Sequence, residues 1–365
     1  MTSRRFTRRA FAAMGSALAL AGCLGDGDDD GNDNSTPTEQ RGTAGNKGTP
    51  LGESTPVDDK VVADQAVGNW HRAESPTSHT LYDVVVSRAG VFAVGEDGVL
   101  VGRCHGMWET VNESNDIEVA GNTLYDASTP DDGSNVWFCG SSGAFGVYEP
   151  KQQRIIDYSA PGEKTSTWET IAVGGTHGNE YIFLGNGSGE LLRGERDGEN
   201  IEWGAPKEPG GGSSHTDMEF PTPNVGFLAD TSGGLYRTTD SGDDWNKIGV
   251  RGAEHALHSI GAADENTVYV SADAGVVYRY NGTTWTETDA GTAGVHGIDI
   301  VDRKTGLCCT SNGEVFKLKN GRWQQVGNFG DITLHSIIYG NEASPHVAVG
   351  ASGAIVERFP DNNSD

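Results

Sequence analysis

The chain has 365 residues, of which 52 are acidic and 26 basic, and its formal net charge is −26. This balance excludes nucleic acid as an expected partner, because a phosphate backbone is bound through cationic side chains. The acidic residues are spread along the chain and lysines are few, as in halophilic acidic proteins, whose dispersed carboxylates keep the surface hydrated; a local acidic patch that binds cations is the specific alternative.

The first 23 residues have the pattern of an export signal. Arg8 and Arg9 form a twin-arginine pair, and the apolar run that follows, residues 12–21, is too short to span a bilayer. Leu20-Ala21-Gly22-Cys23 resembles a lipoprotein cleavage box, which predicts a lipid on Cys23. We therefore expect export of the folded protein by the twin-arginine route and anchoring at the outer face of the cytoplasmic membrane. A cleaved secretory signal with an incidental cysteine is the alternative.

Residues 24–60 are rich in Asp, Asn, Ser, Thr, Pro and Gly and contain almost no apolar side chains. Such a segment cannot bury enough surface to offset its ordering entropy, so it is predicted to be an acidic, disordered tether. Residues 61–360 have a globular composition and are numerous enough to form one large core. Residues 361–365 are predicted to be a short tail.

The globular region repeats one pattern seven times: an apolar run, a polar tight turn that contains glycine, and a second apolar run. The runs are short and rich in β-branched and aromatic residues, which is typical of strands, and the glycine permits positive φ in a tight hairpin. Successive turns are 38 to 46 residues apart, the length of one four-stranded propeller blade. The turn glycines are Gly98, Gly143, Gly189, Gly234, Gly275, Gly313 and Gly353.

The predicted fold class is therefore all-β, a seven-bladed β-propeller. The last unit stops at Phe359 and lacks its outer strand. The segment Val67-Gly68-Asn69-Trp70 looks like that missing strand, so we predict that the N-terminal strand closes the last blade. Closure of this kind removes exposed sheet edges.

One hairpin in the fourth unit carries a recognisable motif. Thr238, Asp240, Gly242 and Trp245 match the Asp-box, S/T-x-D-x-G-x-x-W, in which the aspartate caps its own hairpin and the tryptophan packs beneath it. With the hairpins AVGEDGVL and VAVGASGAIV, it resembles the photosystem II stability/assembly factor-like propellers of the BNR/Asp-box group over about residues 67–359. The resemblance implies an assembly or protein-interaction scaffold more than an enzyme.

One register of the innermost strands provides the candidate site. Side chains at equal register of these strands can point toward a shared channel mouth. Three of them are histidines from three consecutive units, and three imidazoles suit zinc or copper. The alternatives are another ligand or a peptide, and a polar ring that only satisfies backbone groups. The seven residues are Tyr82, Tyr125, Glu169, Thr216, His258, His296 and His335.

A cell-surface glycan hydrolase or lyase that uses carboxylates at the channel mouth is the second functional hypothesis. Asp83, Asp126, Glu169 and Asp217 lie near the starts of four successive innermost strands, and glycoside cleavage needs two carboxylates. The alternative is that these side chains cap strand ends and bond to backbone groups. Sialidase activity is not expected, because the Arg-Ile-Pro segment of Asp-box sialidases is missing.

No catalytic residue and no cofactor are predicted. The expected partners are proteins of unknown identity and, through Cys23, the membrane, and the ring is expected to be monomeric. The other cysteines, Cys104, Cys139, Cys308 and Cys309, show no CxxC or Cys/His metal spacing. Buried free thiols are expected; a disulfide between Cys104 and Cys139 of neighbouring units is the alternative.

Overall fold

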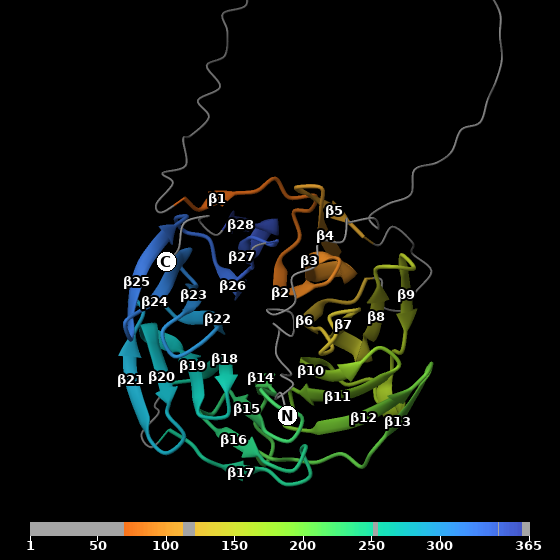
Figure 1. Ribbon diagram of the computed structural model, residues 1–365. Coiled ribbons are helices and arrows are strands. Elements are labelled where there is room, and N and C mark those ends of the chain that lie inside the picture. The colour runs from red at the N-terminus through yellow and green to blue at the C-terminus, as the bar shows by residue number, and fades with distance from the viewer. Residues whose placement is uncertain (1–68, 112–120, 251–254, 342, 360–365) are drawn as a thin grey trace, which may run out of the picture.

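A computed structural model of the protein describes residues 69–111, 121–250, 255–341 and 343–359. They form seven four-stranded antiparallel sheets, arranged as blades around a common axis (Figure 1). The predicted seven-bladed propeller is confirmed. The predicted signal with Arg8, Arg9 and Cys23, the tether and the C-terminal tail all lie outside the described residues. Within those residues, no helix has the length and apolarity needed to cross a membrane.

Each blade is formed by four strands that run from the axis outwards, and blades 1 to 6 follow chain order. Blade 1 contains β2 (Leu81–Ser87), β3 (Gly90–Gly95), β4 (Leu100–Cys104) and β5 (Met107–Thr110). Blade 2 contains β6 (Leu124–Ser128), β7 (Val136–Gly140), β8 (Phe145–Glu149) and β9 (Arg154–Asp157). Blade 3 contains β10 (Trp168–Thr176), β11 (Asn179–Asn186), β12 (Leu191–Asp197) and β13 (Asn200–Trp203).

The second half of the ring continues in the same way. Blade 4 contains β14 (His215–Glu219), β15 (Gly226–Asp230), β16 (Leu235–Thr238) and β17 (Asn246–Lys247). Blade 5 contains β18 (Leu257–Asp264), β19 (Thr267–Ala272), β20 (Val276–Tyr280) and β21 (Trp285–Asp289). Blade 6 contains β22 (Val295–Ile300), β23 (Gly306–Thr310), β24 (Glu314–Lys319) and β25 (Arg322–Asn328). Blade 7 contains β26 (Leu334–Ile338), β27 (His346–Gly350), β28 (Ile355–Arg358) and, from the other end of the chain, β1 (His71–Arg72).

The N-terminal strand closes blade 7, as predicted, but with different residues. His71 pairs with Glu357 and Arg72 with Val356, whereas the sequence indicated residues 67–70. Val67 and Gly68 lie outside the described residues, and Trp70 precedes the strand, with its side chain buried in the core between blades 6 and 7. Arg103 of blade 1 also donates from Nε to Oε2 of Glu357 at 2.7 Å, which ties blade 1 to blade 7.

The glycines of the hairpins between second and third strands have φ between 70° and 82°, which favours glycine. Blade 4 corrects one prediction, since Gly233, with φ 77°, takes this conformation instead of Gly234. The backbone N–H of Gly234 donates to Oδ1 of Asp230 at 2.6 Å, which holds it in the turn. The correction moves the turn by one residue and leaves the blade intact.

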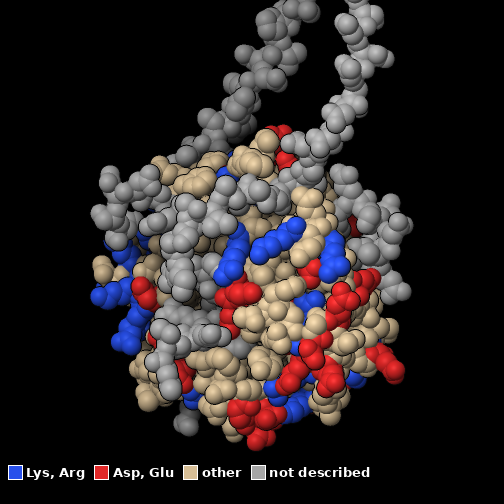
Figure 2. Space-filling view, turned by 45° about the vertical axis from the view of Figure 1, so that its right-hand side comes forward, with Lys and Arg blue, Asp and Glu red and all other residues tan. Residues whose placement is uncertain are grey.

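Acidic side chains are spread over the outer surface. Figure 2 shows one face, on which Asp and Glu side chains gather in groups with Lys and Arg side chains between them. Several acidic and basic side chains form ion pairs between neighbouring strands or blades. Nη2 of Arg237, for example, lies 3.3 Å from Oε2 of Glu265. The carboxylates on this face are therefore distributed over several groups.

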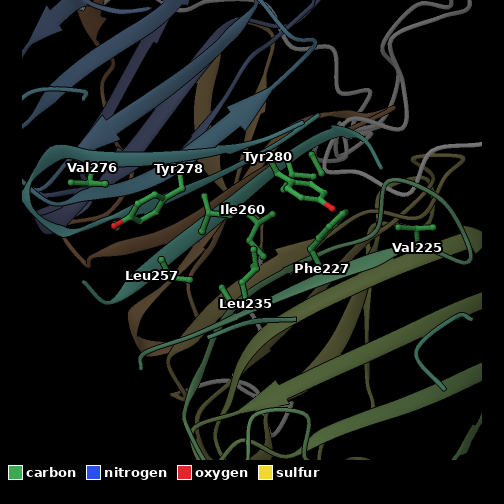
Figure 3. Close-up of a cluster of buried hydrophobic side chains, with 13 residues drawn as sticks. Val225, Phe227, Leu235, Leu257, Ile260, Val276, Tyr278 and Tyr280 are labelled. Atoms are coloured by element: carbon green, nitrogen blue, oxygen red, sulfur yellow. The ribbon is translucent and has the colours of Figure 1, made fainter. Parts of the chain in front are cut away.

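The hydrophobic core lies between adjacent blades, because each sheet buries both of its faces against its neighbours. Between blades 4 and 5, Phe227 and Leu235 from one sheet pack with Leu257, Ile260 and Tyr278 from the next (Figure 3). Similar clusters fill the other interfaces of the ring. Burial of this kind holds the blades in a fixed relative orientation.

Three cysteines are fully buried inside the propeller. Cys139, Cys308 and Cys309 are buried free thiols, as expected, so the alternative of a disulfide between Cys104 and Cys139 is wrong. The expectation of a free thiol is wrong for Cys104, which is disulfide-bonded. Cys139 faces blade 3 and donates to the carbonyl oxygen of Trp168 at 3.5 Å. Burial raises the pKa of all three thiols, so thiolate chemistry is not expected of them.

Candidate functional site

The seven predicted side chains all lie at the start of the innermost strands, at one end of the propeller. Each is partly exposed while the residues on either side of it are buried. We call this set the mouth ring; it comprises Tyr82, Tyr125, Glu169, Thr216, His258, His296 and His335.

A β-bulge explains why these side chains emerge from the sheet. In every blade the pairing between first and second strands shifts at the mouth-ring residue, for example between Leu81 and Asp83 around Tyr82. The bulged residue has no partner on the second strand, and a bulge re-aims the side chain that it carries. Seven bulges at one register therefore place seven side chains at one end of the axis.

Five members of the mouth ring form a continuous line of contacting rings, which we call the aromatic arc. The ring centroids of Tyr125 and Tyr82 are 5.4 Å apart, and those of Tyr82 and His335 are 5.1 Å apart. The line continues from His335 to His296 at 5.8 Å and from His296 to His258 at 5.0 Å. Such spacings are those of interacting aromatic pairs. Glu169 and Thr216, from blades 3 and 4, complete the ring.

Two carboxylates that sequence reasoning missed support this line, one at Tyr82, next to one end, and the other at His258, the opposite end. Oε1 of Glu96 accepts from the Tyr82 hydroxyl at 3.4 Å, and its Oε2 accepts from the backbone N–H of Thr80 at 2.8 Å. Oδ1 of Asp273 lies 2.8 Å from Nε2 of His258. Both carboxylates occupy the first position of the turn between the second and third strands of their blades. The alignment of the repeats therefore already contained a signal that could have identified them.

Burial shifts the pKa of several members of the mouth ring in the direction that favours their neutral forms. Burial, and then the neighbouring His258 and His335, lower the pKa of His296 to about 4, and burial lowers the pKa of His335. Burial raises the pKa of both tyrosines. The hydrogen bond from the Thr80 N–H lowers the pKa of Glu96, whereas burial raises that of Glu169.

Stability should fall in mild acid because two histidines are buried as neutral groups. Burial lowers the pKa of His215 and of His296 to about 4, so below pH 6.5 the unfolded chain binds protons that the folded chain does not. We expect each histidine to cost about 2 kcal/mol between pH 7.5 and pH 5. Urea unfolding at both pH values measures this, and His215→Leu should reduce the loss of stability between pH 7.5 and pH 5 by about 2 kcal/mol. An unchanged loss of stability between pH 7.5 and pH 5 in that variant would contradict the expectation.

The three histidines lie in a row of ring contacts, in which His258 is tilted by 55° from His296. The planes of His296 and His335 differ by only 15°, which is a stacking geometry. Among the residues that the structure describes, no group of three His, Cys, Asp or Glu side chains is placed to hold a metal ion. The geometry of the mouth ring is therefore that of a contact surface of flat rings.

Three of the four carboxylates considered for glycan chemistry hold neighbouring blades together, as the capping alternative predicted. Oδ2 of Asp83 accepts from the N–H of Ala127 in blade 2 at 3.1 Å. Asp126 accepts from the N–H of Ile171 in blade 3 at 2.8 Å, and Asp217 from that of Ile260 in blade 5 at 2.7 Å. All three are buried one residue beyond the bulge. Glu169 differs because it occupies the bulge itself and lies at the mouth.

In the hairpin whose sequence matches the Asp-box, the aspartate accepts hydrogen bonds from its own turn. Oδ1 of Asp240 accepts from the Thr238 hydroxyl at 2.7 Å and from the N–H of Asp244 at 2.9 Å. Trp245 packs edge-on against Phe220, with ring centroids 5.9 Å apart. This hairpin joins the third and fourth strands of blade 4, away from the mouth ring.

Solved structures show what this fold resembles. No protein-family model and no curated protein sequence matches the chain. YCF48 from Cyanidioschyzon merolae is 13% identical, with a TM-score of 0.64 over 81% of this chain and 100% of that one. A structure of YCF48 bound to D1 peptide is 14% identical, with a TM-score of 0.64 over 80% and 97%. Virginiamycin B lyase from Staphylococcus aureus is 16% identical, with a TM-score of 0.64 over 79% and 98%. At these identities the likeness concerns the fold alone.

Proposed function

We propose that this protein is a non-enzymatic scaffold, tethered outside the cytoplasmic membrane, that binds a segment of a partner protein across the mouth ring. The observation that carries the proposal is the aromatic arc, in which five flat, partly exposed side chains are held on bulges of five blades. Aromatic side chains supply contact area at low cost in conformational entropy, which is what a peptide platform needs.

Two further facts support this proposal. The buried aspartates at the start of the inner strands bond to the next blade, so they have a structural role that requires no substrate. A propeller of the same fold, YCF48, has been solved with a bound peptide. The proposed lipid on Cys23 and the acidic segment after it would hold the ring near the membrane but allow it to reach a membrane-bound partner.

Photo-crosslinking in intact cells, at the salt concentration in which they grow, tests the proposal. A photoreactive residue in place of His335 should yield a discrete crosslinked partner, whereas the same residue at Thr286, exposed on an outer strand, should not. Cys23→Ala should move both the protein and the adduct from the membrane to the soluble fraction. Equal crosslinking from both positions, or none from His335, would argue against a partner at the mouth ring.

A lyase or hydrolase that acts on glycans is the second candidate. One observation favours it: Glu169 is a carboxylate at the mouth whose pKa is raised by burial, as a general acid requires, and a lyase is among the proteins of similar fold. Turnover of a cell-surface glycan by the purified protein, abolished by Glu169→Gln, would support this candidate and overturn the scaffold. Turnover that survives Glu169→Gln would exclude Glu169 as the acid.

A further inference from the structure

The part of the mouth ring contributed by blades 1 to 3 combines aromatic faces with carboxylates. The rings of Tyr82 and Tyr125 lie 5.4 Å apart with their planes inclined by 56°, so they present two faces at an angle. Glu96 is fixed beside Tyr82 by its bonds to the Tyr82 hydroxyl and the Thr80 N–H. Glu169 is the next mouth-ring residue beyond Tyr125 and is half-buried.

The charge around this part of the ring has one sign. The connections at this end of the propeller contain two lysines and no arginine among their described residues. Both lysines are already engaged: Lys164 with Glu190 at 2.7 Å, and Lys207 with the carbonyl oxygen of Gly242 at 3.1 Å and the carboxylate of Asp243 at 3.4 Å. Glu96 and Glu169 therefore face the mouth without a neighbouring lysine or arginine to neutralise them in the described part of the chain.

We infer that Tyr82, Tyr125, Glu96 and Glu169 form a subsite for a cationic side chain, arginine or lysine, of the bound segment. The inference rests on the proposed function and adds the chemistry that the segment must carry. A cation is attracted to the face of an aromatic ring and pairs with a carboxylate, and both attractions are strengthened where water is partly excluded. His296 and His335 add stacking surface, and burial lowers the pKa of both, which favours their neutral rings.

The burial of Glu169 supplies a reason for selectivity. A half-buried carboxylate loses hydration that nothing in the described contacts of Glu169 replaces, and burial accordingly raises its pKa. An arriving guanidinium or ammonium group restores the missing interaction, whereas a neutral amide restores little and a carboxylate opposes it. Local geometry, more than the overall charge of −26, should therefore decide which peptides bind.

The test compares three acetylated and amidated pentapeptides, Gly-Gly-X-Gly-Gly with arginine, glutamine or glutamate at the centre, binding to the full-length protein. High salt suppresses long-range attraction by the acidic surface. We expect the arginine peptide to bind about tenfold more tightly than the glutamine peptide. Tyr125→Leu and Glu169→Gln should each lower the affinity for the arginine peptide about five- to tenfold and leave the affinity for the glutamine peptide unchanged. Glu202→Gln, which removes an exposed charge on outer strand β13, is the matched control and should have no effect.

The outcomes separate this inference from the proposed function. Equal affinity for the arginine and glutamine peptides, with loss of both in His335→Ala, would overturn the cationic subsite and leave a peptide platform standing. An equal loss in Glu202→Gln and Glu169→Gln would show general charge attraction and overturn the subsite as well. If no peptide binds and His335 yields no crosslink, both proposals fail.

Discussion

Replacing Arg196 with methionine is expected to lower the free energy of unfolding by about 3–5 kcal/mol at pH 7, the cost of leaving a buried charge without its partner. The Arg196 side chain is only 2% exposed. Its Nη1 lies 3.0 Å from Oε1 of Glu180, and its Nη2 lies 3.6 Å from Oε1 of Glu149, across the interface of blades 3 and 2. The guanidinium also lies over the ring of Trp137, 5.2 Å from the centroid.

Glu180 bears most of the cost. Glu149 keeps a second partner, because Nε of Arg154 donates to its Oε2 at 2.8 Å, whereas Glu180 is fully buried and pairs with Arg196. Burial already raises the pKa of Glu180 in the intact protein, and removal of the guanidinium should raise it further. The variant should then lose less stability at pH 5 than at pH 7, because Glu180 can take up a proton.

Urea unfolding of the variant and the parent at both pH values measures this effect. Arg154→Met is the matched control, since the Arg154 side chain is half exposed and its loss should cost much less than that of Arg196. Arg196→Met combined with Glu180→Leu should recover much of the loss, because an apolar pair of similar volume replaces the buried ion pair. A cost of Arg196→Met no larger than that of Arg154→Met would contradict the expectation.

Asp217→Asn is expected to destabilise the protein by about 2–3 kcal/mol, although it changes almost no volume. Oδ2 of Asp217 accepts from the Ile260 N–H at 2.7 Å and from the Ser259 hydroxyl at 2.8 Å, and Oδ1 accepts from the Met218 N–H at 2.7 Å. The asparagine amide has only one oxygen, so its NH₂ group replaces one of the two acceptors. The NH₂ group then faces a hydrogen-bond donor, which is left without an acceptor. The contact between blades 4 and 5 is therefore weakened at the start of the inner strands.

Urea unfolding of Asp217→Asn and of the parent measures this effect. Asp289→Asn, on the exposed outer strand β21, is the control, and we expect it to change the free energy of unfolding by no more than about 0.5 kcal/mol. Asp217→Asn should also increase hydrogen exchange at Ile260 in the next blade. Equal stability of the two variants, with unchanged exchange at Ile260, would show that the inter-blade bond contributes little.

Local signals in the sequence determined the blades. The hairpin between second and third strands needs only a short turn with glycine at positive φ, and alternation of apolar residues decides which sheet faces are buried. Both of these signals lie within about ten residues of sequence. Because the hairpin recurs about every forty residues, the sequence alone was enough to count seven blades and to see that the last one lacked a strand. The exact closing residues, His71 and Arg72, depended on how Trp70 packs between two blades.

The candidate site was determined only in part by the sequence. Alignment of the inner strands found the register of the mouth ring because related units place equivalent residues at equal positions. The alignment placed Glu169, but not Asp83, at this register, yet it could not show that Asp83 turns away from the mouth, since a bulge of one residue reverses the direction of a side chain and no local pattern announces it. Asp83 moreover bonds to Ser336, which is 253 residues away along the chain. Only the closed ring brings such groups together, so the tertiary structure decided which carboxylates hold the blades and which remain at the mouth.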